Sequence, residues 1–345
     1  MTQLPSCITD AFLRQATLCE GMGSPFTATL NRLLADEITK GPLFDALAAW
    51  DGDAFADVIG LRLCAGLQAQ AWQDPALAAL FPPHPTDEAA LRRALARLTG
   101  GDALLEWLPS APQTNEVGRS AVLLGGYAHI AARFGLPLAL HEIGASAGVN
   151  LFADQYYHDL GNGLSYGDPA APVRLSCAWS GALPPLDTPI RITRRRGMDL
   201  APLDARDPAQ RTRMLAYIWA DQPERRHRAT AALETVAASN LHIEQGDAAA
   251  WLEALADTPP EPGEVRVIQH TVMWQYLPEA TKARCTAAIE RMARAASPDA
   301  PLAWLRLELD PALGASAVDL TTWPGTAQRL GTANFHGAYA HWADS

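Results

Sequence analysis

The sequence predicts an α/β fold in which helices cover both faces of a mostly parallel β-sheet, with a separate helical region in front of it. Through residues 1–112, apolar side chains recur at helical spacing and no run has the alternation of a strand. After this region, short apolar runs alternate with helical segments, which is typical of a parallel sheet covered on both faces. We therefore expect a helical cap or accessory domain over 1–112 and a sheet domain over 113–345.

The order of elements in the sheet domain follows from periodicity and from turn residues. A capped helix is expected to follow Thr114-Asn115-Glu116 and to run to residue 134. We expect a helical segment with a break near Pro223, and two last strands that form a hairpin and give the sheet an antiparallel edge. The predicted strands are 136–143, 189–200, 240–247, 264–271, 302–309, 317–323 and 338–342, and the predicted helices between them are 147–157, 207–238, 248–256 and 278–296.

Composition and charge narrow the class of protein. The chain of 345 residues has a formal net charge of -11, which argues against a general nucleic-acid binder because phosphate binding needs a basic surface. Five scattered cysteines without C-x-x-C spacing indicate reduced thiols, not a disulfide framework or a zinc cluster. The sequence shows no signal-peptide pattern and no apolar stretch long enough to span a membrane. We expect a cytoplasmic protein that binds neither membranes nor metal ions.

The segment HEIGASAGVNL, residues 141–151, has two possible functions. Its G-x-S-x-G pattern, with Ser146 at the centre, is the turn that presents the nucleophile of serine hydrolases. Asp310 and His336 follow in the chain order that such enzymes use. However, the residues before this turn are mostly helical, and no upstream His-Gly-Gly segment supplies an oxyanion hole. The hydrolase therefore stays the less favoured interpretation.

The second possibility is a turn that lets a nucleotide approach the end of a parallel strand. The G-x-G-x-x-G pattern of nicotinamide cofactors is not met, because Ser146 and Val149 occupy two of its glycine positions. The S-adenosylmethionine site of Rossmann-like methyltransferases needs a carboxylate near the strand end, then small residues that leave backbone N–H groups facing the ligand. Glu142, Gly144, Ser146 and Gly148 meet this need.

Acidic residues at the ends of later strands strengthen the prediction of this cofactor. Asp199 ends the second strand, where it would bind the ribose hydroxyls, and Asp247 follows the third strand, where it would meet the adenine amine. Because ligands of open α/β sheets bind at the carboxyl ends of strands, these acids and the glycine turn should lie together. An alternative for each aspartate is a helix N-cap, which needs the same residue type.

The fourth strand end, His270 to Pro278, is the expected place for groups that act on the methyl acceptor. His270 could act as a general base or orient a nucleophile, since the ordinary pKa of histidine is near neutrality. Tyr276 could line the acceptor pocket, and Glu116, one helical turn from Arg119, could face the ligand beside the glycine turn. We name His270, Tyr276 and Glu116 as the candidate catalytic residues.

A set of ordered motifs also resembles a bacterial family catalogued as domain of unknown function 2332. The motifs span residues 113–345, and His336 lies in the last of them. The resemblance implies that the polar motif residues form one site, and that the core is similar to that of methyltransferases. The segments that carry it are QTNEVGR, HEIGASAGVNL, RRGMDLAPLD, AYIWADQPER, HTVMWQYLP, WLRLE, WPGT and FHG.

Together these observations predict a Rossmann-like, methyltransferase-type three-layer sandwich with an N-terminal helical cap. The predicted function is S-adenosylmethionine-dependent methylation of a small molecule held between the sheet edge and the cap. Two alternatives stay open, a non-catalytic nucleotide-binding sensor and a serine hydrolase acting through Ser146. The oligomeric state and the methyl acceptor do not follow from the sequence.

Overall fold

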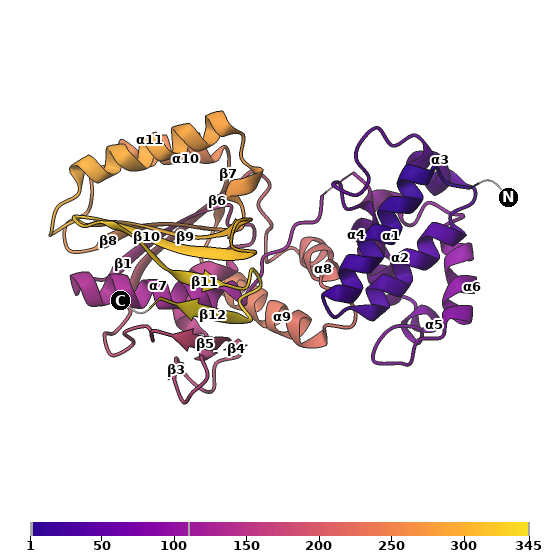
Figure 1. Cartoon of the computed structure of the whole chain (residues 1–345), viewed down its shortest axis with the longest axis horizontal. Helices are drawn as coiled ribbons and strands as arrows, with labels where there is room; N and C mark the ends of the chain where they lie inside the picture. The colour runs from indigo at the N-terminus through magenta and orange to yellow at the C-terminus, as the bar shows by residue number, and fades with distance from the viewer. Residues whose placement is uncertain (1–2, 110, 344–345) are drawn as a thin grey trace. The chain divides into compact units, whose positions relative to one another are not determined.

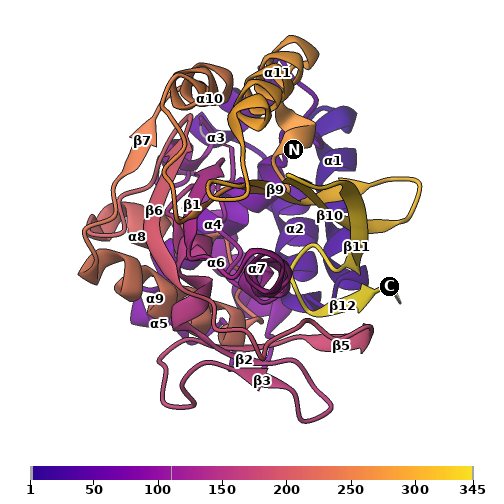
Figure 2. The same cartoon turned by 90° about the vertical axis from the view of Figure 1, so that its left-hand side faces the viewer.

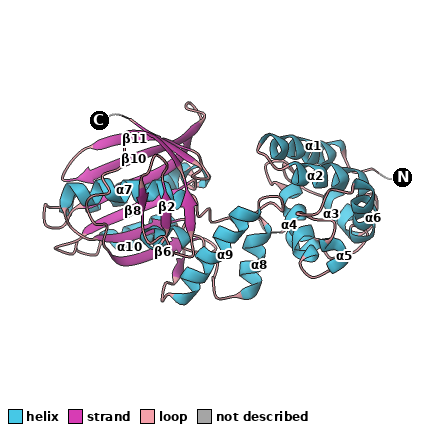
Figure 3. Ribbon diagram, turned by 90° about the horizontal axis from the view of Figure 1, so that it is seen from below, coloured by secondary structure: helices cyan, strands magenta, loops and turns pink. Residues whose placement is uncertain are grey.

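A computed structural model describes residues 3–109 and 111–343. The chain divides into two compact units. Unit 1 contains residues 1–114 and 208–227, and unit 2 contains residues 115–207 and 228–345. Figure 3 shows unit 1 as helices and loops and places the strands in unit 2.

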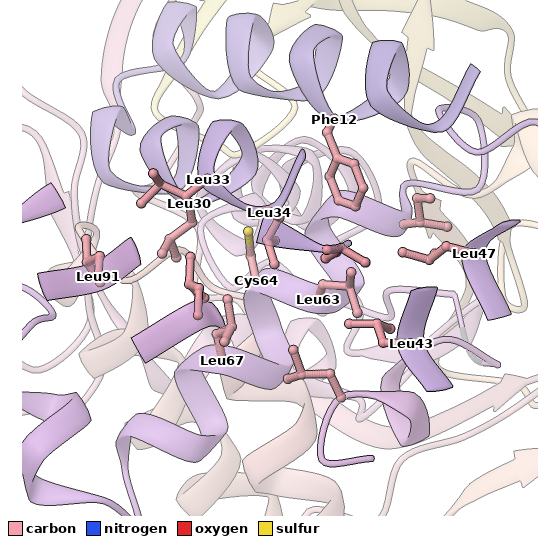
Figure 4. Packing of buried hydrophobic residues seen from close by; sticks show 14 of the residues in the cluster. Phe12, Leu30, Leu33, Leu34, Leu43, Leu47, Leu63, Cys64, Leu67 and Leu91 are labelled. Carbon is pink, nitrogen blue, oxygen red and sulfur yellow. The ribbon is translucent and has the colours of Figure 1, made fainter. Parts of the chain in front are cut away.

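Unit 1 is built from short amphipathic helices around an aliphatic core. Phe12, Leu30, Leu34, Leu63 and other buried side chains meet at its centre (Figure 4). Turn chemistry sets where the helices begin: α2 starts with a proline at its first position, and the Asp87 carboxylate accepts the Ala90 N–H at the start of α6. The helices are α1 (Ser6–Gly21), α2 (Pro25–Glu37), α3 (Pro42–Ala48), α4 (Ile59–Ala71), α5 (Pro75–Ala78), α6 (Glu88–Leu98) and the 3₁₀-helix η1 (Leu105–Trp107).

Residues 208–227, which the sequence analysis places with the sheet, complete the core of unit 1. They form α8 (Pro208–Ala216) and the start of α9 (Pro223–Ala238). The Gln68 side chain donates to the Ile218 carbonyl at 2.7 Å, and the Asp221 carboxylate accepts the Phe26 N–H at 3.0 Å. Ala220 is buried within the same cluster as the leucines of α2 and α4. The helical unit is therefore formed from two separate stretches of chain.

Unit 2 is organised around a sheet of nine strands. Its strand order is β5-β12-β11-β10-β9-β8-β1-β6-β7 (Figure 1). From β7 to β9 all neighbours are parallel, whereas β9, β10, β11 and β12 are antiparallel to one another and β5 adds in parallel at the far edge. A second, small sheet has the order β3-β2-β4. The strands are β1 (Leu138–Ile143), β2 (Tyr157–Asp159), β3 (Ser165–Tyr166), β4 (Arg174–Ser176), β5 (Ala178–Gly181), β6 (Ile192–Asp199), β7 (Ile243–Gln245), β8 (Val265–Thr271), β9 (Leu302–Asp310), β10 (Ala315–Trp323), β11 (Ala327–Ala333) and β12 (Tyr339–Trp342).

Helices cover both faces of this sheet, so the predicted three-layer, Rossmann-like α/β fold is confirmed. α10 (Ala248–Ala256) and α11 (Glu279–Ala295) lie on one face, and α7 (Arg119–Phe134) lies on the other (Figure 1). Every residue of β1 and β8 is buried, including polar ones such as Glu142 and His270, as expected of strands that are covered on both faces. Figure 2 shows α7 end-on, with the antiparallel strands curving around it.

Two predicted elements differ in the structure. The last two strands are not a hairpin, because β11, which the sequence analysis missed, pairs with β10 and separates it from β12. The segment after the glycine turn is the 3₁₀-helix η2 (Val149–Gln155), interrupted by non-helical geometry at Phe152, and not an α-helix. Its side chains are buried, so tertiary packing overrides the helical pattern there.

The topology defines where a ligand would bind. From β1 the chain adds β6 and β7 on one side, and β8 and β9 then add on the other side of β1. The carboxyl ends of β1 and β8 therefore flank a topological switch point, where open α/β sheets bind their ligands. The glycine turn follows β1 directly, and His270 lies near the end of β8.

Two adjacent glycines allow α7 to approach the sheet closely. A Cβ at Gly126 would lie 2.5 Å from Leu305 Cδ2, and a Cβ at Gly125 would lie 2.6 Å from the Trp179 ring.

We predict that Gly126→Ala destabilises the protein by about 1–3 kcal/mol through overpacking, although alanine favours the helix. Urea unfolding measures this change. Gly21→Ala at the end of α1, where no atom lies within 4 Å, is the matched control and should be neutral; equal stability of both variants would contradict the packing argument.

Candidate functional site

The turn after β1 has a backbone that favours glycine. Gly144, Ser146 and Gly148 have φ angles of 68°, 53° and 82°, and a non-glycine residue in this region is uncommon. Protein side chains fill the space beside both glycines. A Cβ at Gly144 would lie 2.8 Å from Met273 Cγ, and a Cβ at Gly148 would lie 2.7 Å from a methyl group of Leu241. Both glycines therefore serve close packing of the turn against neighbouring segments.

The Asp199 carboxylate at the end of β6 holds this turn. One oxygen accepts the Ser146 N–H at 2.8 Å, and the other accepts the Ala201 N–H at 3.0 Å. Backbone bonds reinforce the contact: Ala145 N–H donates to the Met198 carbonyl at 3.0 Å, and Leu203 N–H donates to the Ser146 carbonyl at 3.2 Å. The structure thus brings predicted residues Asp199 and Ser146 into direct contact, where Asp199 stabilises the strained serine conformation.

Asp247, the acid predicted at the third strand end, caps α10. Its carboxylate accepts the Ala250 N–H at 2.9 Å and lies 3.6 Å from the Arg284 guanidinium. The preceding residue, Gly246, donates its N–H to the Asp199 carbonyl at 3.0 Å, so the two strand ends are neighbours. The helix-cap role that the sequence also allowed is therefore present, and the contact with adenine stays a prediction.

Glu142 is a carboxyl group inside the protein. It is 1% exposed, and its Oε2 atom has no hydrogen-bond partner in the part of the chain that the structure describes. Burial raises the pKa of this carboxyl to about 8, since desolvation disfavours the charged form, while the Gln269 amide and the Arg119 guanidinium lower the pKa and Asp199 raises it. Glu142 is consequently a protonated acid at neutral pH.

A polar side-chain group under α7 surrounds this acid. Glu142 and Gln269 are paired residues on the adjacent strands β1 and β8. The Tyr127 hydroxyl of α7 donates to Gln269 Oε1 at 2.5 Å. Two further buried polar atoms near the turn, Ser146 Oγ and Asn150 Nδ2, lack a partner within the described structure. Buried polar atoms without partners are rare in proteins, and such a group of them is typical of a place that a polar ligand or water completes.

The start of α7 connects β8 to the loop between β11 and β12. The Glu116 carboxylate accepts the Gly118 N–H at 3.1 Å. Arg119 donates to the Thr271 carbonyl at 3.2 Å and to the Phe335 carbonyl at 2.8 Å. Gly118 lies so close to this loop that a Cβ there would be 2.2 Å from the His336 carbonyl oxygen. Glu116 therefore stabilises the start of α7, and its contact with a ligand stays a prediction.

His270, the predicted general base, has a partner on each ring nitrogen. Trp304 Nε1–H donates to His270 Nε2 at 3.1 Å, and His270 Nδ1 lies 2.6 Å from a Glu308 oxygen. Because the indole N–H can only donate, Nε2 must accept, so the proton is on Nδ1. The ring is 0% exposed and stacks on Trp274 at 4.8 Å. A ring held in this way positions its neighbours and has no nitrogen left for a ligand.

Glu308 is a site residue that the sequence analysis did not identify. Besides His270, its carboxylate accepts the N–H groups of Met273 and Trp274, at 3.1 and 3.2 Å. These bonds hold the turn after β8, where Val272 has a φ of 50°, a strained conformation for a β-branched residue. In the sequence, Glu308 is marked only as the acid that ends the segment WLRLE. The residues to which it bonds lie more than 30 positions earlier in the chain.

Tyr276, the remaining predicted catalytic residue, follows this turn in the short 3₁₀-helix η3 (Trp274–Tyr276). It is 76% exposed. Exposure on this scale leaves the ring accessible to a ligand. Its role on the acceptor side stays a prediction.

Comparison with known protein families identifies one match. A family model described as an uncharacterised protein conserved in bacteria, DUF2332, matches residues 9–342. The chain belongs to this family. The match includes the helical residues before 113 as well as the sheet unit, so the DUF2332 region extends beyond the motifs found by sequence analysis. No curated protein and no solved structure matches the DUF2332 chain.

Two further searches concern membranes and metals. Among residues 3–109 and 111–343, none of the helices combines the length and apolar character that a bilayer crossing needs. The same described residues contain no group of three or more histidine, cysteine, aspartate or glutamate side chains arranged to hold a metal ion.

The buried carboxyl of Glu142 predicts a pH dependence of stability. Its folded-state pKa of about 8 is above the ordinary value of 4.5. The contribution of a group with a raised pKa is therefore fully present below about pH 4.5 and is lost as pH rises through about 8. Between pH 5 and pH 8, the free energy of unfolding of wild type should therefore fall by a few kcal/mol relative to that of Glu142→Gln, which cannot ionise. The limit for one proton is about 1.4 kcal/mol per pH unit. Urea unfolding at both pH values measures this; a pH-independent difference would contradict the buried, protonated acid.

The Glu308 contacts predict a second change in stability. Glu308→Gln replaces one acceptor oxygen by an NH₂ group that faces N–H donors, so we expect a loss of about 1–3 kcal/mol. Glu253→Gln is the control, because its pair with Arg284 is on the surface and should contribute about 0–1 kcal/mol. Thermal unfolding of both variants compares the two carboxylates, and equal losses would show that Glu308 does not hold the turn after β8.

Proposed function

We propose that this DUF2332 protein is an S-adenosylmethionine-dependent methyltransferase acting on a small molecule. The cofactor would bind in the crevice at the carboxyl ends of β1 and β8. The observation that carries the proposal is the contact between the Asp199 carboxylate and the Ser146 N–H at the switch point of the sheet. It places an acid of the second strand directly beside the glycine turn of the first, as a nucleoside site in this fold requires.

The chemistry of the neighbouring residues fits such a cofactor. Ser146 Oγ and Glu142 Oε2 are buried polar atoms without partners, and they would face the polar methionine part. Asp199 would meet the ribose and Asp247 the adenine. Both aspartates already accept backbone N–H groups, but a carboxylate has about four lone-pair positions and can accept from ligand hydroxyls as well.

Binding at the turn would require one side chain to move. The Met273 side chain lies against Gly144, on the path that a ligand would take to the backbone there. Methionine has three rotatable bonds and changes conformation at low cost. The surrounding turn is held by Glu308, so a movement of Met273 does not require the backbone to rearrange.

Methyl transfer suits a site without a free general base. S-adenosylmethionine supplies a methyl group on a positively charged sulfur when it is bound. The protein then has to align the acceptor and exclude water, which by itself can remove much of the barrier. His270 has partners on both nitrogens and would stabilise the turn after β8, on one side of the site. Tyr276 and Glu116 would contact the acceptor.

The serine hydrolase has less support. An active serine must hydrogen-bond to a base, whereas Ser146 Oγ has no partner among the described residues. The conformation of Ser146 is accounted for by the Asp199 contact. A nucleotide sensor would use the same crevice and differs from the enzyme only in lacking turnover.

Calorimetric titration with S-adenosylhomocysteine tests the proposal. Wild-type protein should bind with a micromolar Kd, about −8 kcal/mol. Asp199→Asn should weaken binding by about tenfold or more, since a charged acceptor of hydroxyl protons is lost. Asp159→Asn is the matched control, because Asp159 makes the same contact to the N–H two residues on in the small sheet, Gly161 at 2.9 Å. No binding at millimolar ligand, or equal binding by both variants, would overturn the proposed function.

A further inference from the structure

The carboxyl of Glu142 lies at the switch point, and no cation among the described residues is bonded to it. Its Oε2 atom is buried without a donor, and its strand neighbour Gln269 is neutral. Arg119 is a cation that lowers the pKa of Glu142, and its guanidinium already donates to the Thr271 and Phe335 carbonyls. A buried carboxylate without a bonded cation is unfavourable by several kcal/mol, so the group is held in its protonated form.

The titratable groups around Glu142 come from three elements. α7 contributes Arg119 and Tyr127, whose phenol pKa is raised well above 10 by burial. The end of β6 contributes Asp199, whose negative charge opposes ionisation of Glu142. The segment after η2 contributes Tyr156, which is buried and hydrogen-bonded to the Val149 carbonyl.

One ion pair lies beyond these groups. Arg195 of β6 bonds to Asp154 of η2 through both carboxylate oxygens, at 2.7 and 2.5 Å. The charges that shift the pKa of Glu142 are those of Arg119, which lowers it, and Asp199, which raises it. Arg119 already donates to backbone carbonyls, and Asp199 disfavours the charged form of Glu142. A positive charge added beside Glu142 would favour its carboxylate form.

We propose that Glu142 makes this site selective for a positively charged ligand, because the carboxyl releases its proton when a cation binds at the carboxyl ends of β1 and β8. The inference rests on the proposed function and deepens it. The cation would be the sulfonium of S-adenosylmethionine, and the product S-adenosylhomocysteine, a neutral thioether, would not trigger the release. The two ligands share their ammonium, carboxylate and nucleoside groups, so their comparison isolates this one charge.

The step is an acid dissociation. The O–H bond of the Glu142 carboxyl breaks, its electron pair stays on oxygen, and the proton passes to the solvent. No redox change occurs and no bond in the ligand is altered. The carboxylate of Glu142 would then stabilise a bound cation by Coulomb attraction in a region of low dielectric constant. With a ligand that lacks the sulfonium charge, Glu142 would keep its proton, and that ligand would lack this part of the affinity.

Proton linkage gives the expected pH dependence. Below a pKa of about 8, each binding event of the cation must release a proton, so its affinity rises with pH and levels off above that value. The ratio of S-adenosylmethionine to S-adenosylhomocysteine affinity should rise by about threefold to tenfold per pH unit between about pH 6 and 8, tenfold being the limit for one full proton.

The experiment is calorimetry of the full chain with each ligand at pH 6, 7 and 8, in two buffers that differ in ionisation enthalpy. Wild-type protein should release up to one proton with S-adenosylmethionine and distinctly less with S-adenosylhomocysteine. Glu142→Gln should remove this difference and give an affinity ratio that does not vary with pH. Glu264→Gln, at the opposite end of β8 where Glu264 pairs with Arg194, is the control and should behave as wild type.

The possible outcomes distinguish the role of Glu142 from the proposed methyltransferase function. If both ligands bind with equal proton release and a constant affinity ratio, the role of Glu142 is overturned and the methyltransferase proposal stands. The same holds if Glu142→Gln keeps the wild-type pH dependence. If neither ligand binds at millimolar concentration, both proposals fail. The proton count on wild-type protein decides the question even if the variant does not fold.

Discussion

Two carboxylates determine the geometry at the switch point of the sheet. Each comes from a strand that flanks the central pair, Asp199 from β6 beside β1 and Glu308 from β9 beside β8. Each accepts backbone N–H groups from the turn that follows the central strand, and each turn contains a residue with positive φ, Ser146 or Val272. Such strained turns persist only where neighbouring groups fix them. Hydrogen bonds to these two carboxylates therefore fix the turns that follow β1 and β8.

A third acid in the same region shows how strongly the environment decides what a carboxyl does. Asp199 and Glu308 each have N–H donors on both oxygens. Glu142, two residues before Gly144, is buried with one oxygen that lacks a donor among the described residues, and its pKa is raised to about 8. The first two acids hold turns through their hydrogen bonds, and the third is able to change its charge.

Much of the fold could be predicted because the apolar residues that become buried follow one another within single segments of the sequence. β1 and β8 are buried throughout, and each has an apolar stretch that marks it in the sequence, Leu138–Leu140 and Val267–Ile268. β11 could not be predicted in the same way, since its first three residues are exposed and its pairing depends on β10 and β12. Residues 208–227 look like part of the sheet domain, because nothing local shows that Ala220 packs with leucines far earlier in the chain.

For the site, one predicted proximity is observed, but the hydrogen-bond partners of the predicted residues did not follow from the sequence. Asp199 and Ser146 were expected near one another and are in contact. The role of His270 depends on Trp304 and Glu308, which lie 34 and 38 residues later and become neighbours only through the pairing of β8 with β9. Histidine at a strand end is equally compatible with a base and with a buried, fully bonded ring. Only the tertiary partners distinguish the two.

The division of unit 1 into two stretches of chain also bears on how the protein is made. Its core lacks α8 and Ala220 until residue 227 has left the ribosome, and by then β1 and β6 of unit 2 have already been synthesised. Domains that are continuous in sequence can fold one after the other during synthesis. Here the core of the helical unit stays incomplete until residue 227 has emerged, so part of the sheet unit emerges before the helical unit can finish folding.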